Sequence, residues 1–404
     1  MENVRKENKY LPLIGGVIIQ IFVGIIYIWS IFQEPVMEYF SWSHAEAALT
    51  FSIMLPVNVL GVMTGGVLND KKGARFVLIL GSILMSAGLV LSSVIPRGLP
   101  WLLYIFYAGM SGFGGGLIYN TTVSCAQKWW LHKKGLAGGI IVCAYGMSTV
   151  IFTPLVNMLL GENGVGFKNT FRILAVVFLV IILLAGPFIV NPSEEYMRQF
   201  AQPDKTVREQ GQFTPVEVLK SPQYYMILVC LLSLTPAYLM LNPMIKSFGR
   251  LRGLSEEAAV ASVMITGIAS AAGRLTAAWL SDKIGGRRVL RILYVITIIC
   301  ILSIWHIEGW LFIVLIALIT YAYGGCAGVT PVLSTEYFGT RYMSTNFGLV
   351  MVSVMISGAL YPALGSRVSA GGVPSSATFI IPICLCVIGL LSAKLLGDHE
   401  KMNL

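Results

Sequence analysis

Charged residues are scarce in this 404-residue sequence, in which Asp, Glu, Lys and Arg together make up only 12%. A soluble protein usually carries about a quarter of its residues as charges. Hydrophobic residues reach 56% instead, and they gather in runs long enough to cross a bilayer. The composition therefore excludes an ordinary soluble enzyme. It predicts an all-α membrane protein that spans the lipid bilayer several times.

Groups that commonly carry catalysis or bind metals are also rare. There are only 4 histidines, and we find no histidine, Asp or Glu deep inside an apolar run. The 7 cysteines fall within apolar runs without paired metal-ligand spacing, so we interpret them as small buried side chains. We therefore expect no catalytic residue, no metal and no cofactor. A membrane-embedded enzyme, the main rival class, would need such groups to converge.

The positive charge is distributed as in a membrane protein. The formal net charge is +9, but Lys and Arg gather at the ends of apolar segments, which argues against a nucleic-acid partner. We count twelve such segments, at 10–32, 46–68, 75–95, 101–127, 135–160, 169–190, 223–247, 256–281, 288–306, 309–335, 344–366 and 376–397. Most Lys and Arg residues lie on the side that carries both chain ends. We therefore predict a multi-pass protein of the cell (inner) membrane with both termini in the cytoplasm. No small-residue cleavage site follows the N-terminal stretch, so we expect no secretory signal.

Two halves of the sequence repeat one loop pattern. The longest polar stretch, 191–222, separates six apolar segments from six more. The pattern D-K-x-G-x-R follows the second segment, at 70–75, and the eighth, at 282–287. We therefore predict an N-terminal six-helix bundle at 1–190, a cytoplasmic linker at 191–222 and a C-terminal six-helix bundle at 223–404.

Smaller signals refine this plan. In each repeated loop the glycine allows a tight turn, and the Asp lies at a helix end, where it can pair with basic residues of the loop or of a neighbouring helix. Within the linker, residues 214–217 read Thr-Pro-Val-Glu, which predicts the start of a short helix. Glycines are dense in 101–127, 135–160 and 309–335, and we expect them to permit close helix packing.

The double loop, the twelve segments and the long linker resemble the major facilitator superfamily over the whole chain. That resemblance implies two six-helix pseudo-repeat bundles around a central cavity, which rock to expose it to each side in turn. It also implies that the two repeated loops form a conformational gate on the inner face. The gate residues expected from it are Asp70, Arg75, Asp282 and Arg287.

One arginine cannot lie near the end of a predicted span. Arg274 precedes Asp282 by eight residues, so it lies about 12 Å from that loop along a helix. The hydrocarbon core is about 30 Å thick, which puts Arg274 close to its midplane. A charge there costs at least about 2.5 kcal/mol and usually marks a substrate or ion pathway. Two alternatives stay open: a guanidinium that snorkels to the interface, and a structural arginine bonded to backbone carbonyls.

The chemistry of a guanidinium indicates the substrate class. The sequence offers no deep acid to neutralise Arg274, and a bound anion would relieve the cost of a buried charge. A guanidinium matches a carboxylate with two parallel hydrogen bonds, so we expect a small carboxylate. Tyr27 and Tyr119 lie at similar depth and can donate to carboxylate oxygens, although each alone is more often a packing residue.

Four stretches resemble the oxalate/formate antiporter family and the related monocarboxylate carriers. They are GIIYIW at 24–29, Tyr119 with KWW at 128–130 and KKGLAG at 133–138, SPQYY at 221–225, and Gly273-Arg274 with SDKI at 281–284. By this resemblance Arg274 matches the substrate-binding arginine. Tyr27, Tyr119 and Tyr323 match aromatic positions that line the oxalate pocket, where the last is a Trp.

Three positions depart from that pattern. Val354 stands where oxalate carriers have a lysine, and Ile26 stands where their pocket has a Gln. With one cation in place of two, a monocarboxylate fits the charge count better than oxalate. Ser270, one turn before Arg274, occupies the position of an Asp in animal-type monocarboxylate carriers. No obvious residue supports proton symport. Exchange of the cargo for a counter-anion therefore stays open as an alternative to symport.

The sequence thus predicts a secondary transporter and not an enzyme. Its expected cargo is a small monocarboxylate of the pyruvate, lactate or formate type, bound by Arg274, Ser270, Tyr27, Tyr119 and Tyr323. The alternatives are an oxalate/formate-type dicarboxylate antiporter and an exporter of another organic anion or drug. The other expected partners are the bilayer and a proton or counter-anion, and we expect a monomer.

Overall fold

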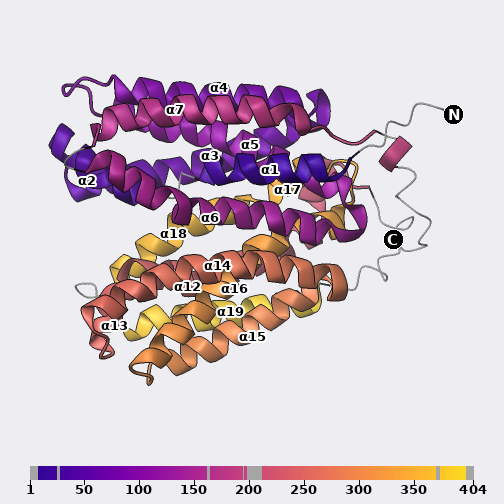
Figure 1. The fold of residues 1–404 in the computed structure, drawn as a ribbon. Helices are drawn as coiled ribbons and strands as arrows, with labels where there is room; N and C mark the ends of the chain where they lie inside the picture. The colour runs from indigo at the N-terminus through magenta and orange to yellow at the C-terminus, as the bar shows by residue number, and fades with distance from the viewer. Residues whose placement is uncertain are drawn as a thin grey trace. The chain divides into compact units, whose positions relative to one another are not determined.

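The computed structural model describes residues 8–24, 28–161, 164–193, 195–197, 212–369 and 374–396. All regular secondary structure within these ranges is helical, which confirms the predicted all-α class (Figure 1). The longer elements are α1 (Tyr10–Val23), α2 (Trp29–Phe40), α3 (His44–Lys72), α4 (Ala74–Ser93), the π-helix η2 (Tyr104–Ser111), α5 (Gly112–Trp129), α6 (Lys134–Leu160), α7 (Gly166–Ala185), α10 (Pro215–Lys220), α11 (Pro222–Leu234), α12 (Pro236–Leu241), α13 (Ile245–Leu251), α14 (Glu256–Ile284), α15 (Gly286–Ile304), α16 (Trp310–Phe338), α17 (Met343–Val350), α18 (Val352–Val368) and α19 (Ser376–Leu395).

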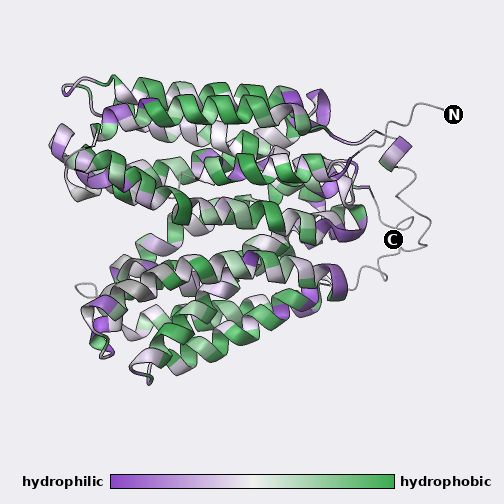
Figure 2. Cartoon of the chain, viewed as in Figure 1, coloured by the Kyte–Doolittle hydropathy of each residue, from purple (hydrophilic) through white to green (hydrophobic). Residues whose placement is uncertain are grey.

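The helices have the surface of a membrane protein. Among the described residues, 8 helices are long and apolar enough to cross a bilayer. Figure 2 shows hydrophobic residues along the helices, with hydrophilic ones gathered near their ends and in the loops. Large apolar side chains such as Leu184, Trp310 and Leu395 are mostly exposed, which suits contact with lipid tails.

The chain forms two compact units. Unit 1 consists of Met1–Leu131, Ala144–Gln202 and Met343–Leu349, and unit 2 of His132–Cys143, Pro203–Tyr342 and Val350–Leu404. The units follow the two sequence halves except at two helix ends. The start of α6 packs within unit 2, and most of α17 packs within unit 1. Each half of the sequence therefore gives one helix end to the unit built mainly from the other half.

Two of the predicted segments contain a break in the helix. Segment 344–366 is divided between α17 and α18 at Met351, while segment 10–32 includes residues 25–27, which lie outside the described ranges. Segment 223–247 is divided into α11, α12 and α13, with Pro236 at the first position of α12. A proline fits there because its missing N–H would have no intrahelical partner. Such breaks are tolerated at membrane depth where protein covers the freed backbone groups.

The repeated loops and the linker start have the local geometry that the sequence predicts. Gly73 after α3 and Gly285 after α14 both have φ of +84°, which confirms the tight turns. In the linker, Thr214 caps α10: its N–H donates to Glu217 Oε2 at 2.7 Å, and the Glu217 N–H donates back to Oγ1 at 3.4 Å. The bonds that Glu217 Oε2 accepts from the Thr214 N–H and from the Thr214 hydroxyl lower the pKa of Glu217. The cap therefore stabilises α10 at pH values above the ordinary glutamate pKa. This contribution is lost as the pH falls through the lowered pKa of Glu217.

Helix backbones approach closely within unit 1. A Cβ at Gly116 of α5 would overlap the carbonyl oxygen of Asn58 in α3, and a Cβ at Gly61 of α3 would overlap that of Phe113. Contacts of this kind give van der Waals packing where burial from lipid provides no net drive. They confirm the packing role predicted for the glycines of segment 101–127.

Gly116→Ala is expected to destabilise the protein by about 1–3 kcal/mol, because the added methyl group must displace the backbone of α3. Gly267→Ala in α14 is the matched control, since a Cβ there would meet no atom within 4 Å. Thermal unfolding of the purified protein in detergent measures both. Equal melting temperatures for Gly116→Ala and the unmodified protein would contradict the packing role.

Candidate functional site

Arg274 lies well inside α14 and is only 7% exposed. Its Nη1 donates a hydrogen bond to the backbone carbonyl of Val142 in α6, at 3.4 Å, within unit 2. This burial argues against a guanidinium that snorkels to the interface. The carbonyl contact is the one expected of a structural arginine, so binding of a ligand by Arg274 would be a second role for the same side chain.

Glycines of two neighbouring helices hold α14 at the level of Arg274. A Cβ at Gly324 of α16 would overlap the carbonyl oxygen of Ser270, and a Cβ at Gly328 would overlap that of Arg274. The start of α6 approaches α14 equally closely at Gly135. These backbone contacts fix the depth of Arg274, because α14 cannot slide without losing them.

Two further predicted residues lie near Arg274 in unit 2. Ser270, one turn before it, is half-buried, and its carbonyl meets Gly324 of α16. The neighbour of that glycine is Tyr323, whose ring centroid lies 4.6 Å from that of Tyr238 in α12. The structure therefore brings Arg274, Ser270 and Tyr323 to adjacent turns of the α14–α16 contact.

The remaining predicted aromatic residues belong to unit 1. The ring centroid of Tyr119 in α5 lies 4.8 Å from that of Tyr145 in α6 and 6.3 Å from that of Phe347 in α17. Tyr27 lies outside the described residues. Tyr119 is thus part of an aromatic cluster, and its contact with a substrate stays a prediction.

Amide side chains hold Tyr119 and its helix in place. Gln20 of α1 donates from Nε2 to the backbone carbonyl of Tyr119 at 3.3 Å. Asn120 donates from Nδ2 to the carbonyl of Val62 in α3 at 2.7 Å and to that of Ser344 in α17 at 2.9 Å. The sequence shows these polar residues within apolar segments, but their hydrogen-bond partners lie on other helices and do not follow from the sequence.

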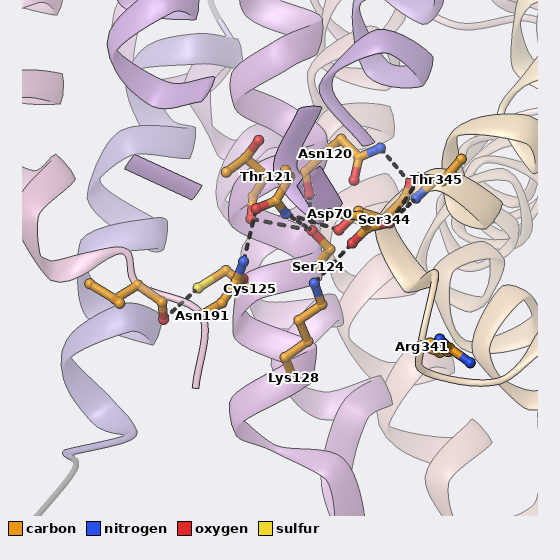
Figure 3. Close-up of polar contacts among 12 residues, drawn as sticks. Asp70, Asn120, Thr121, Ser124, Cys125, Lys128, Asn191, Arg341, Ser344 and Thr345 are labelled. Carbon is orange, nitrogen blue, oxygen red and sulfur yellow. Dashed lines mark hydrogen bonds and ion pairs between the residues drawn. The ribbon is translucent and has the colours of Figure 1, made fainter. Parts of the chain in front are cut away.

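Asp70 caps the start of α17, within unit 1 (Figure 3). Its Oδ2 accepts hydrogen bonds from the backbone N–H of Thr345 at 3.0 Å and from the Thr345 hydroxyl at 2.8 Å. The Lys128 ammonium lies 3.1 Å from Oδ1, the single salt bridge found among the described residues. A carboxylate is favoured at a helix N-terminus, where it meets unpaired N–H groups and the positive end of the dipole.

Asp282 caps the start of α6 in the same way, within unit 2. Its Oδ1 accepts from the N–H of Gly135 and its Oδ2 from that of Leu136, both at 2.7 Å. Each Asp of the repeated pattern therefore holds the first turn of a helix from the other half of the sequence. Pairing with a basic residue of a neighbouring helix, as expected from the sequence, is seen for Asp70 with Lys128, but the backbone contacts were not foreseen.

The arginines of the repeated pattern contact other helices. Arg75 donates from Nη2 to the carbonyl of Pro187 at 3.1 Å, and Nη1 of Arg287 donates to the carbonyl of Leu396. Both acceptors follow the last helix of the arginine's own half. The acid and the arginine of each loop thus hold different helices, and a shared gating role for all four residues stays a prediction.

Another acid lies near Asp282. Both carboxylate oxygens of Glu336, near the end of α16, accept from the N–H of Gly286 at 3.2 Å, so this side chain caps α15. Asp282 interacts with the cations Lys134 and Lys133 and with the like charge of Glu336, whereas Asp70 forms a salt bridge with the single cation Lys128. The two repeated loops therefore share their capping geometry and differ in their local charge.

Metal-binding chemistry has no support in the described ranges. No group of three or more His, Cys, Asp or Glu side chains there is placed to hold a metal ion. Among the site residues, the buried guanidinium has the chemistry to bind an anion. The two Asp carboxylates cap two helix starts.

Comparisons with known proteins agree with this architecture. The family model described as Major Facilitator Superfamily matches residues 13–362. The chain is 24% identical to the oxalate:formate antiporter of Oxalobacter formigenes over 90% of this chain and 85% of the relative. It is also 24% identical to human monocarboxylate transporter 12, over 84% of this chain and 72% of the relative.

Solved structures share the fold. The crystal structure of the Escherichia coli fucose:proton symporter FucP superposes with a TM-score of 0.69 at 13% identity, over 96% of this chain and 99% of that one. The proton:xylose symporter XylE gives a TM-score of 0.68 at 15% identity, over 96% of this chain and 94% of that one. At these identities the likeness concerns the fold alone.

Asp282→Ala is expected to lower the free energy of unfolding by about 0.5–2 kcal/mol, the usual loss when a helix N-cap is removed. Asp282→Asn should lose less, because one acceptor oxygen remains. Melting temperatures of the purified variants measure the effect, with Lys71→Ala, an exposed residue of the other repeated loop, as control. The capping role is wrong if Asp282→Ala melts at the same temperature as Lys71→Ala.

Proposed function

Because this chain belongs to the Major Facilitator Superfamily, we propose that it carries a small monocarboxylate across the membrane, with Arg274 as the anion-binding residue. Pyruvate, lactate and formate are the expected type of cargo. The proposal places the protein in the cell (inner) membrane as a monomer with both termini in the cytoplasm. Access to the two sides would alternate by movement of its two bundles.

The observation that carries the proposal is the fixed, buried position of Arg274. Glycine contacts hold its helix in register, and the side chain is 7% exposed. An arginine keeps its charge in proteins, so burial does not remove the electrostatic cost. Its planar fork binds a carboxylate through two parallel hydrogen bonds. The names of two relatives, an oxalate:formate antiporter and a monocarboxylate transporter, belong to carriers of such anions.

Substrate binding and gating are linked in this proposal through the pair α14 and α6. Arg274 contacts Val142, and Asp282 caps Gly135 and Leu136, so two points about two turns apart join the same two helices. A carboxylate that draws the guanidinium from the Val142 carbonyl removes one of these points. The Asp282 cap and the close contact at Gly135 then hold the start of α6, and separating it from α14 costs less.

The second candidate is a dicarboxylate antiporter, favoured by the name of the Oxalobacter relative. A dianion would need a second deep cation, and the position that the family resemblance gives to it is the half-buried Val354 of α18. We therefore favour a singly charged cargo. The coupling partner, a proton or a counter-anion, is left to experiment.

Uptake by purified protein in liposomes tests the site. Labelled pyruvate, lactate or formate should enter saturably, and Arg274→Ala should abolish uptake. Arg274→Lys keeps the charge without the fork, so its half-saturation concentration should rise at least about 10-fold. Both variants should be checked for an unchanged melting temperature. Normal uptake by folded Arg274→Ala protein rules out the site. An imposed pH gradient, and then preloaded anion, would separate symport from exchange.

Val354→Lys tests the charge count. If one buried cation sets the preference for a monoanion, this variant should gain binding of oxalate, measured by thermal shift, and lose preference for formate. Val354→Met, which has similar length and no charge, is the matched control. An unchanged ratio of oxalate to formate binding in folded Val354→Lys protein would contradict the charge argument.

A further inference from the structure

Three cations gather at the end of unit 1 that is farthest along the helices from Asp70. Arg97 follows α4, and Lys168 and Arg172 lie one turn apart near the start of α7. Because α4 begins beside the repeated loop at 70–75 and α7 ends beside Arg75, this cluster lies at the opposite end of both helices.

Contacts with one tyrosine bring two of the cations together. The Lys168 ammonium lies 2.6 Å from the hydroxyl of Tyr39 in α2 and 4.2 Å from its ring centroid, and it also donates to the carbonyl of Ile95 at 3.1 Å. The Arg97 guanidinium lies 4.9 Å from the same ring centroid. Such cation–ring contacts hold both charges on one surface.

Arg172 is anchored beside this pair. Its Nε donates to the Ser93 hydroxyl at the end of α4, and its Nη1 donates to the Asn169 side chain, both at 3.1 Å. Within the described part of the chain, no carboxylate lies within 4.0 Å of Arg97, Lys168 or Arg172, since the salt bridge found there is that of Lys128 with Asp70. Like charges at this spacing repel, so the cluster favours an anion from outside the described residues.

The surroundings indicate where that anion comes from. Arg172 begins a stripe on α7 that continues at intervals of four residues with Val176, Val180 and Leu184, which are 60%, 48% and 69% exposed. A continuous apolar stripe of this kind on a membrane helix faces lipid. Aromatic rings, including Trp42 stacked on Tyr104 with centroids 5.0 Å apart, lie at the same end of unit 1, as is usual at a membrane–water interface.

We propose that Arg97, Lys168 and Arg172 form a binding site for the phosphodiester group of an anionic phospholipid. The three cations stand where the lipid-facing stripe of α7 meets the interface, so the acyl chains would lie along Val176 and Val180 while the phosphate contacts the cluster. Tyr39 connects the site to α2, because Lys168 holds its hydroxyl. The site is independent of the transported anion.

Native mass spectrometry of the full-length protein in detergent tests this site, with phosphatidylglycerol titrated against phosphatidylcholine. The variant Arg97→Gln/Lys168→Gln/Arg172→Gln should bind phosphatidylglycerol at least about 10-fold more weakly, because each basic residue near anionic lipid adds to the attraction. The matched control is Lys71→Gln/Lys72→Gln/Arg288→Gln, which removes the same charge from exposed positions in or beside the two repeated loops. Arg172→Gln alone should weaken binding by a smaller factor and serves if the triple variant does not fold.

Three outcomes would overturn the site. Equal binding of phosphatidylcholine and phosphatidylglycerol would show that the net negative charge of the lipid headgroup does not matter. An equal loss in the control variant would assign the effect to net charge. Displacement of phosphatidylglycerol by millimolar inorganic phosphate, with equal affinity for both, would show that the cluster takes free phosphate and not lipid.

Discussion

The first N–H groups of a helix have no intrahelical partner and a buried charge has no water, so other parts of the protein must satisfy both. The first N–H groups of α6 and α17 have no intrahelical partner, and Asp282 and Asp70 accept from them. Arg274 donates to a backbone carbonyl for the same reason. Glycines allow these groups to come within range, since a Cβ at Gly328 or Gly135 would separate the helices on which the contacts depend.

Most of the architecture could be predicted from the sequence because it depends on local patterns. Apolar length predicts the helices, the distribution of Lys and Arg suggests their orientation, and Thr214 with Glu217 marks the start of α10. The burial of Arg274 follows from its distance to the loop at Asp282. Each of these inferences uses residues that are neighbours along one helix or one turn.

The features that could not be predicted from the sequence depend on contacts between distant segments. Nothing in the composition of 134–143 or 343–349 distinguishes the unit in which each packs, because each is simply the start of a membrane segment. Asp70 and Asp282 each have an arginine five residues later in the same loop, which favours local pairing. The structure shows instead that each carboxylate accepts hydrogen bonds from N–H groups at the start of another helix, while Arg75 donates to a carbonyl beyond α7.

The reciprocal capping by the two repeated loops bears on how such a chain could have arisen. Asp70 of the first half caps a helix of the second, and Asp282 of the second caps the corresponding helix of the first. Two identical copies of a single six-helix half would make this contact twice across a two-fold axis, with the same residues on both sides. A duplicated gene could thus fuse such a dimer into one polypeptide with its interface already complete. Later divergence of the two halves would then explain why Lys128 lies beside Asp70 while Glu336 lies near Asp282.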